Sequence, residues 1–252
     1  MIVTNVSTNE SGQRFDKYLK KLLKNAPDSF IYKMLRKKNI VLNGRKADGR
    51  EKLCLGDEVR FFIANETFEK FSTKTDAGNV SPSQYTRAYQ ELADLHILYE
   101  DDNILIVDKP SGVLSQKSAP DAVSVNEWLT GYLLSQHKVT ADSLATFKPS
   151  VCNRLDRNTS GMAGCGKTLA GSQYLSRIIK DKSLEKYYYC IVSGRMVIGE
   201  RVTGYLYKDT RQNKVTVYHS EADIPDRYKG DTVYIDTAFR SVHTANGITL
   251  LE

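Results

Sequence analysis

The sequence has no apolar run of the roughly 18 residues that a membrane-spanning helix needs. Its N-terminus also lacks the charged, apolar and small-residue order of a secretory signal peptide. These absences exclude a membrane-spanning class and favour a cytoplasmic protein. We expect it to work as a monomer with no membrane partner.

Residues that form disulfides or hold metals are few and scattered. No two cysteines form a C-x-x-C pair, and the histidines are equally isolated, which argues against a disulfide framework or a zinc site. We expect reduced, mostly buried thiols and neither a metal nor a cofactor. The residues concerned are Cys54, Cys152, Cys165, Cys190, His96, His137, His219 and His243.

The net charge of +6 belongs to one segment. Residues 11–60 hold 14 Lys or Arg against 6 Asp or Glu, whereas the remaining residues hold 22 against 24. Concentrated positive charge is typical of a nucleic-acid binder. Charge alone fits a solvated helical surface equally well.

The first 65 residues predict a small α/β module. Apolar residues recur at helical spacing over residues 14–24 and again over 30–38, with lysines and arginines on the opposite faces. Strands are predicted at residues 39–42 and 59–63. Asn43-Gly44 is a strong signal for a tight hairpin turn.

Beyond the module, residues 66–90 are polar and predict a linker. Residues 91–252 form a second predicted domain. It begins with a hairpin of residues 95–99 and 104–107, and helices are predicted at 123–135 and 168–180. Strands are predicted at 183–193, 202–207, 214–218 and 232–242. Many strands and few helices indicate an α+β fold with a mixed, largely antiparallel sheet.

A loop at residues 153–161, Asn-Arg-Leu-Asp-Arg-Asn-Thr-Ser-Gly, carries the most chemical information. Asp156 has Arg154 and Arg157 close by, and the residues that follow favour a tight turn ending at a glycine free to adopt positive φ. The pattern predicts an ionised aspartate beside cations. An ordinary surface salt bridge is the alternative.

Residues 161–168 also fit G-x-x-x-x-G-K-[ST], the loop that cradles phosphates in nucleotide triphosphatases. Such a loop follows a buried strand, whereas the residues before Gly161 are polar. Nucleotide hydrolysis is therefore the least favoured interpretation.

The basic module resembles the alpha-L RNA-binding module. The resemblance lies in residues 14–19, 34–44 and 55–59. It implies RNA contacts from Arg14, Lys17, Lys33, Arg36, Lys37, Lys38, Asn43 and Arg45.

The second domain resembles pseudouridine synthases of the ribosomal large-subunit (RluA) type. The R-L-D-R-x-T-S-G loop matches their signature, residues 98–112 resemble a hairpin ending in Lys-Pro-x-Gly, and residues 186–194 resemble a K-x-Y strand. The resemblance implies isomerisation of uridine to pseudouridine without cofactor or metal. Large-subunit ribosomal RNA is the favoured substrate, with tRNA as an alternative.

The resemblance also implies roles for single residues. Asp156 would be catalytic, Arg154 would fill the space left by the flipped base, and Arg157 would contact RNA. Tyr188 would pack on the uracil, although Tyr187, Tyr188 and Tyr189 also fit plain strand residues on alternating faces. Lys109 and Pro110 would shape the loop.

Two departures from the family pattern affect the expected activity. Asn153 stands where the family has histidine, so acid–base chemistry there is not expected. The family's last motif, Gly-Arg-x-His-x-Ile-Arg, is not found before Glu252. Because the arginine of that motif pairs with the catalytic aspartate, we expect weak or no activity from these 252 residues. An RNA-binding protein without catalysis is the alternative function.

If RNA is held mainly through phosphate contacts, its affinity should fall steeply as salt is raised. Lys37→Ala should weaken binding and flatten the slope of log affinity against log salt by about one unit. Filter binding at salt concentrations from about 50 to about 200 mM, a range that includes physiological ionic strength, measures that slope. Salt-insensitive binding would contradict the basic module.

Overall fold

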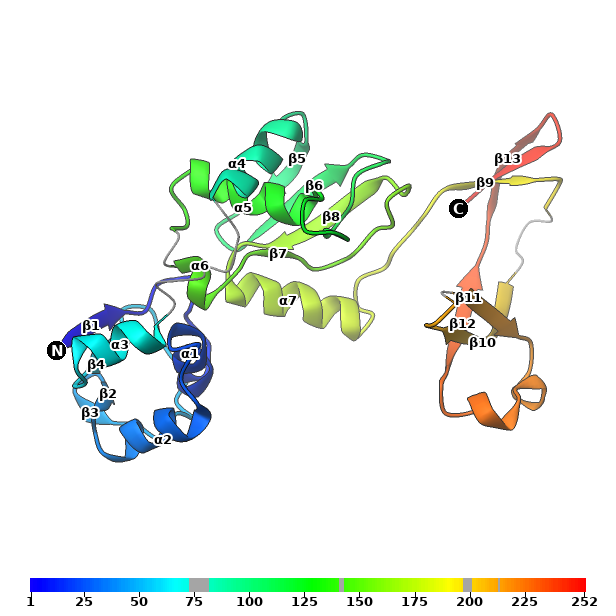
Figure 1. Cartoon of the computed structure of the whole chain (residues 1–252). Coiled ribbons are helices and arrows are strands. Elements are labelled where there is room, and N and C mark those ends of the chain that lie inside the picture. Colours follow the sequence, from blue (N-terminus) through cyan, green and yellow to red (C-terminus); the bar gives the residue numbers. More distant parts are fainter. Residues whose placement is uncertain (73–81, 141–142, 197–200, 213) are drawn as a thin grey trace. The chain divides into compact units, whose positions relative to one another are not determined.

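The structure is a computed structural model that describes residues 1–72, 82–140, 143–196, 201–212 and 214–252. By its internal contacts the chain divides into two compact units, Met1–Leu184 and Glu185–Glu252, and each is described by itself (Figure 1). In the ranges just given, no helix is long and apolar enough to cross a membrane. The predicted division at residues 65 and 90 stays a prediction.

The basic module is the N-terminal part of the first unit. Its strands pair antiparallel in the order β1-β4-β2-β3, and its helices bury Phe15, Leu19, Ile31 and Leu35 against them. The elements are β1 (Ile2–Asn5), α1 (Phe15–Leu22), α2 (Asp28–Arg36), β2 (Ile40–Leu42), β3 (Arg45–Lys46), β4 (Glu58–Phe61) and α3 (Asn65–Phe71). The predicted helices are confirmed, whereas β1, a strand of 4 residues, was missed.

The hairpin turn between β2 and β3 has the predicted form. Asn43 and Gly44 adopt φ of 52° and 72°, the left-handed values that a type I′ turn requires. The Asn43 side chain is also occupied, because it donates to Asp57 Oδ1 and accepts from the Glu58 amide, both at 2.9 Å.

The predicted linker is not free of regular structure. α3 lies at its start and α4 (Pro82–Glu91) at its end, while residues 73–81 fall outside the described ranges. The prediction missed α4 because the segment is polar overall and buries only a few side chains, including Tyr85 and Ala88. Gly131 lets the two helices approach closely, since a Cβ there would lie 2.2 Å from the Tyr85 carbonyl oxygen.

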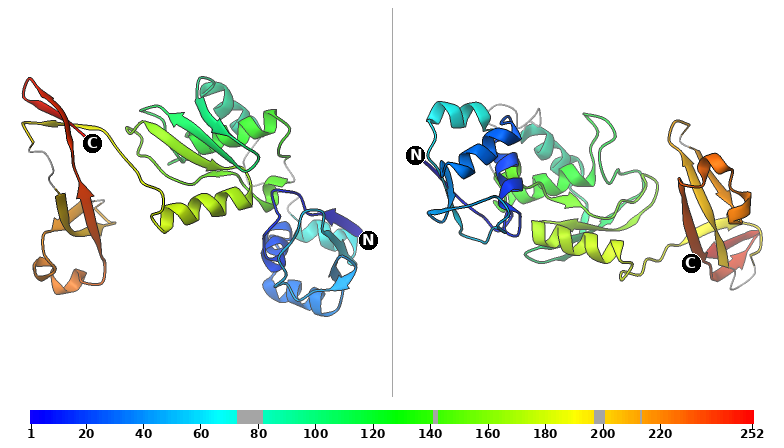
Figure 2. Two further views of the ribbon diagram at one scale, coloured as in Figure 1. Left: turned by 180° about the vertical axis from the view of Figure 1, so that it is seen from behind. Right: turned by 90° about the horizontal axis from the view of Figure 1, so that it is seen from below.

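The larger part of the first unit is a four-stranded antiparallel sheet of order β5-β6-β8-β7. Helices α4 and α5 lie on one face and α7 on the other, as Figures 1 and 2 show. The elements are β5 (His96–Glu100), β6 (Ile104–Lys109), α5 (Val125–Ser135), α6 (Ser143–Thr146), β7 (Ser150–Val151), β8 (Gly161–Gly166) and α7 (Leu169–Lys180). The predicted hairpin and both predicted helices are confirmed; α6, β7 and β8 were missed.

β8 rules against the nucleotide-binding interpretation. Its glycines are rungs of a sheet paired with β6, not an open phosphate loop. They serve close packing instead, because a Cβ on Gly166 would lie 2.1 Å from Ser172 Oγ. Lys167 is buried, and its Nζ donates to Glu100 Oε1 at 2.5 Å and to the Asp101 carbonyl at 2.6 Å.

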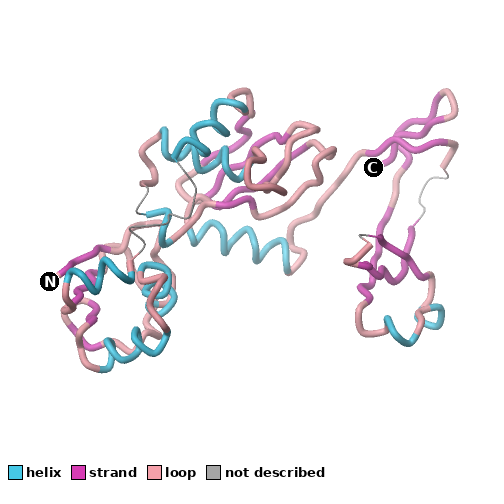
Figure 3. The backbone as a smooth tube through the Cα atoms, viewed as in Figure 1, coloured by secondary structure: helices cyan, strands magenta, loops and turns pink. Residues whose placement is uncertain are grey.

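The second unit holds two three-stranded antiparallel sheets, β11-β10-β12 and β13-β14-β9 (Figure 3). The elements are β9 (Cys190–Ser193), β10 (Arg201–Asp209), β11 (Lys214–Tyr218), the short 3₁₀ helices η1 (Glu221–Asp223) and η2 (Asp226–Tyr228), β12 (Thr232–Ala238), β13 (Ser241–Ala245) and β14 (Ile248–Leu251). The predicted strand at 183–193 begins only at Cys190, and the one at 232–242 is broken in two. The α+β class with largely antiparallel sheets is confirmed.

The expectation of mostly buried thiols is wrong for half of the cysteines. Cys165 is buried and Cys152 is partly buried, whereas Cys54 and Cys190 are exposed.

We predict that Lys167→Met lowers the free energy of unfolding at neutral pH by about 2 kcal/mol, because it leaves a partly buried carboxylate unpaired. Burial opposes ionisation of Glu100, but hydrogen bonds from Lys167 and Tyr132 outweigh it and lower its pKa. This contribution is therefore present above the unfolded pKa and is lost as pH falls through the folded pKa. The difference between the two proteins should shrink in acid.

Urea unfolding at neutral and acidic pH measures this difference, with the exposed Lys180→Met on α7 as the matched control. ATP binding that the unmodified chain shows and Lys167→Met abolishes would instead support the nucleotide interpretation.

Candidate active site

The Asp156 loop, residues 152–160, joins β7 to β8 and contains no helix or strand. Its backbone groups therefore need partners from outside regular structure. At the entrance, the Cys152 amide donates to the Gly164 carbonyl at 2.8 Å. Asn153 continues the pairing with its side chain, because its Oδ1 accepts from the Gly164 amide at 2.6 Å and its Nδ2 donates to the Met162 carbonyl at 3.0 Å. Asn153 thus fixes the loop to β8.

The residue before Asp156 is held by a serine from another segment. The Ser115 hydroxyl donates to the Leu155 carbonyl at 2.7 Å and accepts from the Leu155 amide at 3.0 Å. Both residues are buried. One side chain thereby satisfies both backbone groups of Leu155.

The residue after Asp156 is held by Lys109 and Gly112. Lys109 is 0% exposed, and its Nζ donates to the carbonyls of Val113 at 2.8 Å, Pro110 at 3.1 Å and Arg157 at 3.3 Å. The Gly112 amide donates to the Arg157 carbonyl at 2.8 Å, and Arg157 Nε returns a bond to the Gly112 carbonyl at 3.0 Å. The predicted loop-shaping role of Lys109 agrees with these bonds.

Asp156 itself is exposed, between two backbone segments that are held firmly. Its carbonyl accepts from the Thr159 amide at 3.1 Å, and the loop ends at Gly161 with φ of 125°, the predicted positive value. Burial lowers the pKa of the Lys109 ammonium, and the negative charge of Asp156 opposes that change. In the described residues neither Arg154 nor Arg157 forms an ion pair with Asp156, which disfavours the alternative of an ordinary salt bridge. The ionised aspartate beside cations stays a prediction.

Two further residues predicted for the site, Arg154 and Tyr188, belong to different units. Arg154 is exposed in the same loop as Asp156. Tyr188 is 51% exposed and belongs to the second unit. It precedes β9 rather than lying in it, so the alternative of plain strand residues on alternating faces does not apply, and the role of Tyr188 stays a prediction.

The predicted RNA-binding residues fall into two groups. Arg14, Asn43 and Arg157 are engaged in bonds within the chain; Arg14 donates to Asp16 Oδ1 at 3.1 Å and Oδ2 at 2.9 Å. The other six are exposed cations, and within the described ranges no side-chain hydrogen bond or ion pair engages them. They are Lys17, Lys33, Arg36, Lys37, Lys38 and Arg45. These six are free to meet phosphates.

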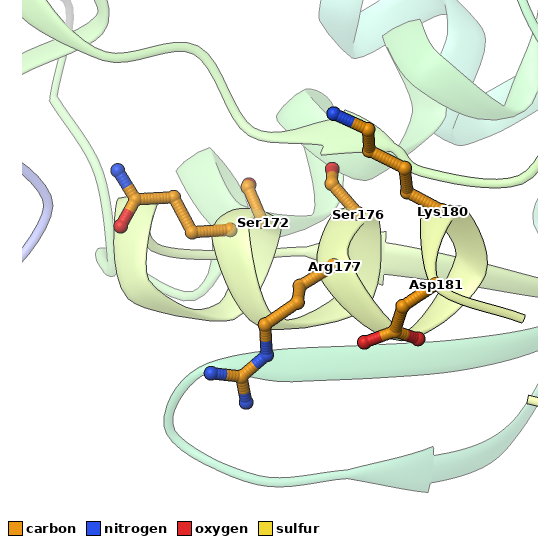
Figure 4. Close-up of a pocket in the computed structure, with 6 residues that line it drawn as sticks. Ser172, Ser176, Arg177, Lys180 and Asp181 are labelled. Atoms are coloured by element: carbon orange, nitrogen blue, oxygen red, sulfur yellow. The ribbon is translucent and has the colours of Figure 1, made fainter. Parts of the chain in front are cut away.

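Two hollows in the first unit are lined by residues outside the Asp156 loop. One, of about 520 Å³, runs along α7 and is lined by Ser172, Gln173, Ser176, Arg177, Lys180 and Asp181 (Figure 4). The other, of about 270 Å³, is lined by Lys138, Lys167 and their neighbours. In the part of the chain that the structure describes, no group of three or more His, Cys, Asp or Glu side chains could hold a metal ion. Because Asp156 and Arg154 are exposed, the candidate site is accessible to a large substrate.

Ser115 is the residue that sequence reasoning missed. A lone serine six positions after Lys109 carries no signal of its own. Only the fold reveals that its hydroxyl meets a backbone segment 40 residues away.

The sequence profile of the RNA pseudouridylate synthase family matches residues 103–252, which include β6, the Asp156 loop and the second unit. The chain belongs to this family. The predicted resemblance to the RluA type is confirmed by its curated relatives, which are named ribosomal large subunit pseudouridine synthase C.

The protein of that name from Vibrio vulnificus (strain CMCP6) is 30% identical over 197 residues, 76% of this chain and 55% of that protein. The one from Escherichia coli (strain K12) is 32% identical over 190 residues, 75% of this chain and 54% of that protein. The chain thus spans about half the length of these relatives. The solved structure of human RNA Pseudouridylate Synthase Domain Containing 4 aligns with a TM-score of 0.48 and 14% identity over 67% of this chain and 61% of that one.

We predict that Lys109→Met lowers the free energy of unfolding by about 3 kcal/mol, because three carbonyl oxygens lose a buried cationic donor. Lys117→Met is the matched control, since Lys117 is exposed on the neighbouring segment. Guanidinium chloride unfolding measures both. Equal stability of the Lys109→Met variant and the unmodified chain would contradict the assignment of Lys109 as the support of the loop.

Proposed function

We propose that this chain isomerises uridine to pseudouridine in RNA, with Asp156 as the catalytic residue. In this reaction the C1′–N1 bond breaks, the uracil turns, and a C1′–C5 bond forms. N1 gains a proton and C5 loses its hydrogen, so the product has the composition of the substrate. The relatives' names favour large-subunit ribosomal RNA as the substrate, with tRNA as the alternative. A ribosomal RNA substrate also favours the predicted cytoplasmic location.

The observation that carries the proposal is the way the Asp156 loop is held. The family match includes this loop, and the backbone is fixed on both sides of an exposed carboxylate. A carboxylate beside the anomeric carbon stabilises oxocarbenium-like charge, as in glycosidases. Isomerisation needs no activated water, so one carboxylate suffices. Attack on carbon and removal of a ribose proton both remain compatible with this position.

The open setting of Asp156 fits a base that has left its stack. Flipping a nucleotide out of its stack costs on the order of a few kcal/mol. We propose that Arg154, exposed two residues before Asp156, fills the vacated space and offsets part of that cost by stacking. Tyr188 is proposed to pack on the flipped uracil. The six exposed cations of the basic module, with Arg14, Asn43 and Arg157 in lesser roles, are proposed to hold the surrounding RNA.

Tritium release from RNA that carries 5-³H-uridine tests the proposal, because C5 must lose its hydrogen. Release by the unmodified chain should vanish in Asp156→Asn, which removes only the charge. The matched control is Asp94→Asn, an exposed aspartate outside the loop. It should keep the unmodified rate.

The same assay tests the expectation of weak activity from these 252 residues. If the gene encodes residues past Glu252, that longer chain serves as the comparison. Release by Asp156→Asn at the unmodified rate would refute the catalytic assignment. Silence from every chain, with RNA binding retained, would leave the RNA-binding alternative.

A further inference from the structure

The first turn of α5 provides a fixed support beside the Asp156 loop. The Val125 amide donates to the Leu114 carbonyl at 2.9 Å, and the Asn126 amide donates to the Ser115 carbonyl at 3.2 Å. Leu114 and Ser124 form a parallel bridge next to these bonds. Ser115 is therefore held by the backbone of a helix whose start is itself capped by Ser124.

The same turn reaches the strand that leads into the loop. Asn126 Oδ1 accepts from the Val151 amide of β7 at 2.8 Å. Asn126 thus bonds to Ser115 with its amide and to β7 with its side chain. The strand that leads into the loop and the residue that holds Leu155 are thus both hydrogen-bonded to the first turn of α5.

Ser115 transmits this support to Leu155. Its hydroxyl acts as a donor and an acceptor at once, so it replaces both bonds of a β-ladder rung with a single side chain. Ser115 is 4% exposed and Leu155 is 8% exposed, so water does not readily substitute for either bond. Leu155 is also the residue whose backbone torsions set the position of the Asp156 Cα.

We propose that Ser115 is a positioning residue for the reaction: its hydroxyl fixes the backbone of Leu155, and thereby the approach of the Asp156 carboxylate to the ribose. This inference rests on the proposed function. It assigns to Ser115 no contact with substrate. A displacement of about 1 Å at a catalytic group can lower the rate by about a hundred-fold. The two hydrogen bonds between the Ser115 hydroxyl and Leu155, here called the Ser115 clasp, would prevent a displacement of that size.

Three variants isolate the hydroxyl. Ser115→Ala removes both bonds with almost no change in volume, and Ser115→Thr retains the hydroxyl. Ser135→Ala is the matched control, because Ser135 also donates to a backbone carbonyl, that of Tyr132 at 2.7 Å, but at the far end of α5. All three are made in the full chain.

Two measurements test the Ser115 clasp and the proposed function independently. Hydrogen exchange of the Leu155 amide reports the clasp without any catalysis, and Ser115→Ala should speed it by about ten-fold or more. Single-turnover tritium release reports the chemical step, which should slow by about ten- to a hundred-fold. RNA affinity should stay within about two-fold, because the affinity comes largely from phosphate contacts elsewhere. Ser115→Thr should restore both rates, and Ser135→Ala should change neither.

An unchanged rate of hydrogen exchange at the Leu155 amide in Ser115→Ala would show that the Ser115 clasp does not hold the loop. Faster exchange with an undiminished chemical step would overturn the positioning role, as would a loss of activity explained wholly by weaker RNA binding. If neither the unmodified chain nor a chain extended past Glu252 releases tritium, the proposed function fails and the positioning role fails with it. In that case the exchange data still decide whether Ser115 holds the loop.

Discussion

The structure of the site depends on one constraint: a loop without secondary structure must still find a hydrogen-bond partner for each buried backbone group. The Asp156 loop meets it with three side chains from different places. Asn153 binds β8, Ser115 binds Leu155, and Lys109 binds the Arg157 carbonyl. Because each bond joins the loop to the sheet or to the segment that follows β6, the exposed carboxylate stands on a rigid support.

The surrounding sheet explains how these side chains meet. Lys109 ends β6 and Gly161 begins β8, and these two residues pair directly in the antiparallel register. The segment after β6 and the loop before β8 therefore emerge at the same edge. The glycines of β8 let α7 pack closely at the other end of the sheet, which accounts for the phosphate-loop pattern without a nucleotide. Family membership and the geometry of the loop thus both support the proposed isomerisation of uridine at Asp156.

Much of the fold could be predicted from local pattern. The helices of the basic module, the turn at Asn43, the hairpin of β5 and β6, and the capped start of α7 at Thr168 all follow from periodicity and turn chemistry. Other elements depend on distant partners and were missed. α4 is polar and becomes a helix packed on α5. Residues 161–166 fit part of a phosphate-loop pattern by themselves and form β8 only because β6 and β7 pair with them. The strand predicted through Tyr188 begins only at Cys190, where β14 supplies a partner.

The sequence by itself determined the family, the α+β class, the basic module and the identity of the proposed catalytic aspartate, because each is written in contiguous residues. The tertiary structure decided how that aspartate is held. It supplied Lys109 as a donor to the Arg157 carbonyl and brought in Ser115, which no pattern marks. The physical reason is distance along the chain. A hydrogen bond between residues 40 positions apart exists only once the sheet has brought two loops to one edge.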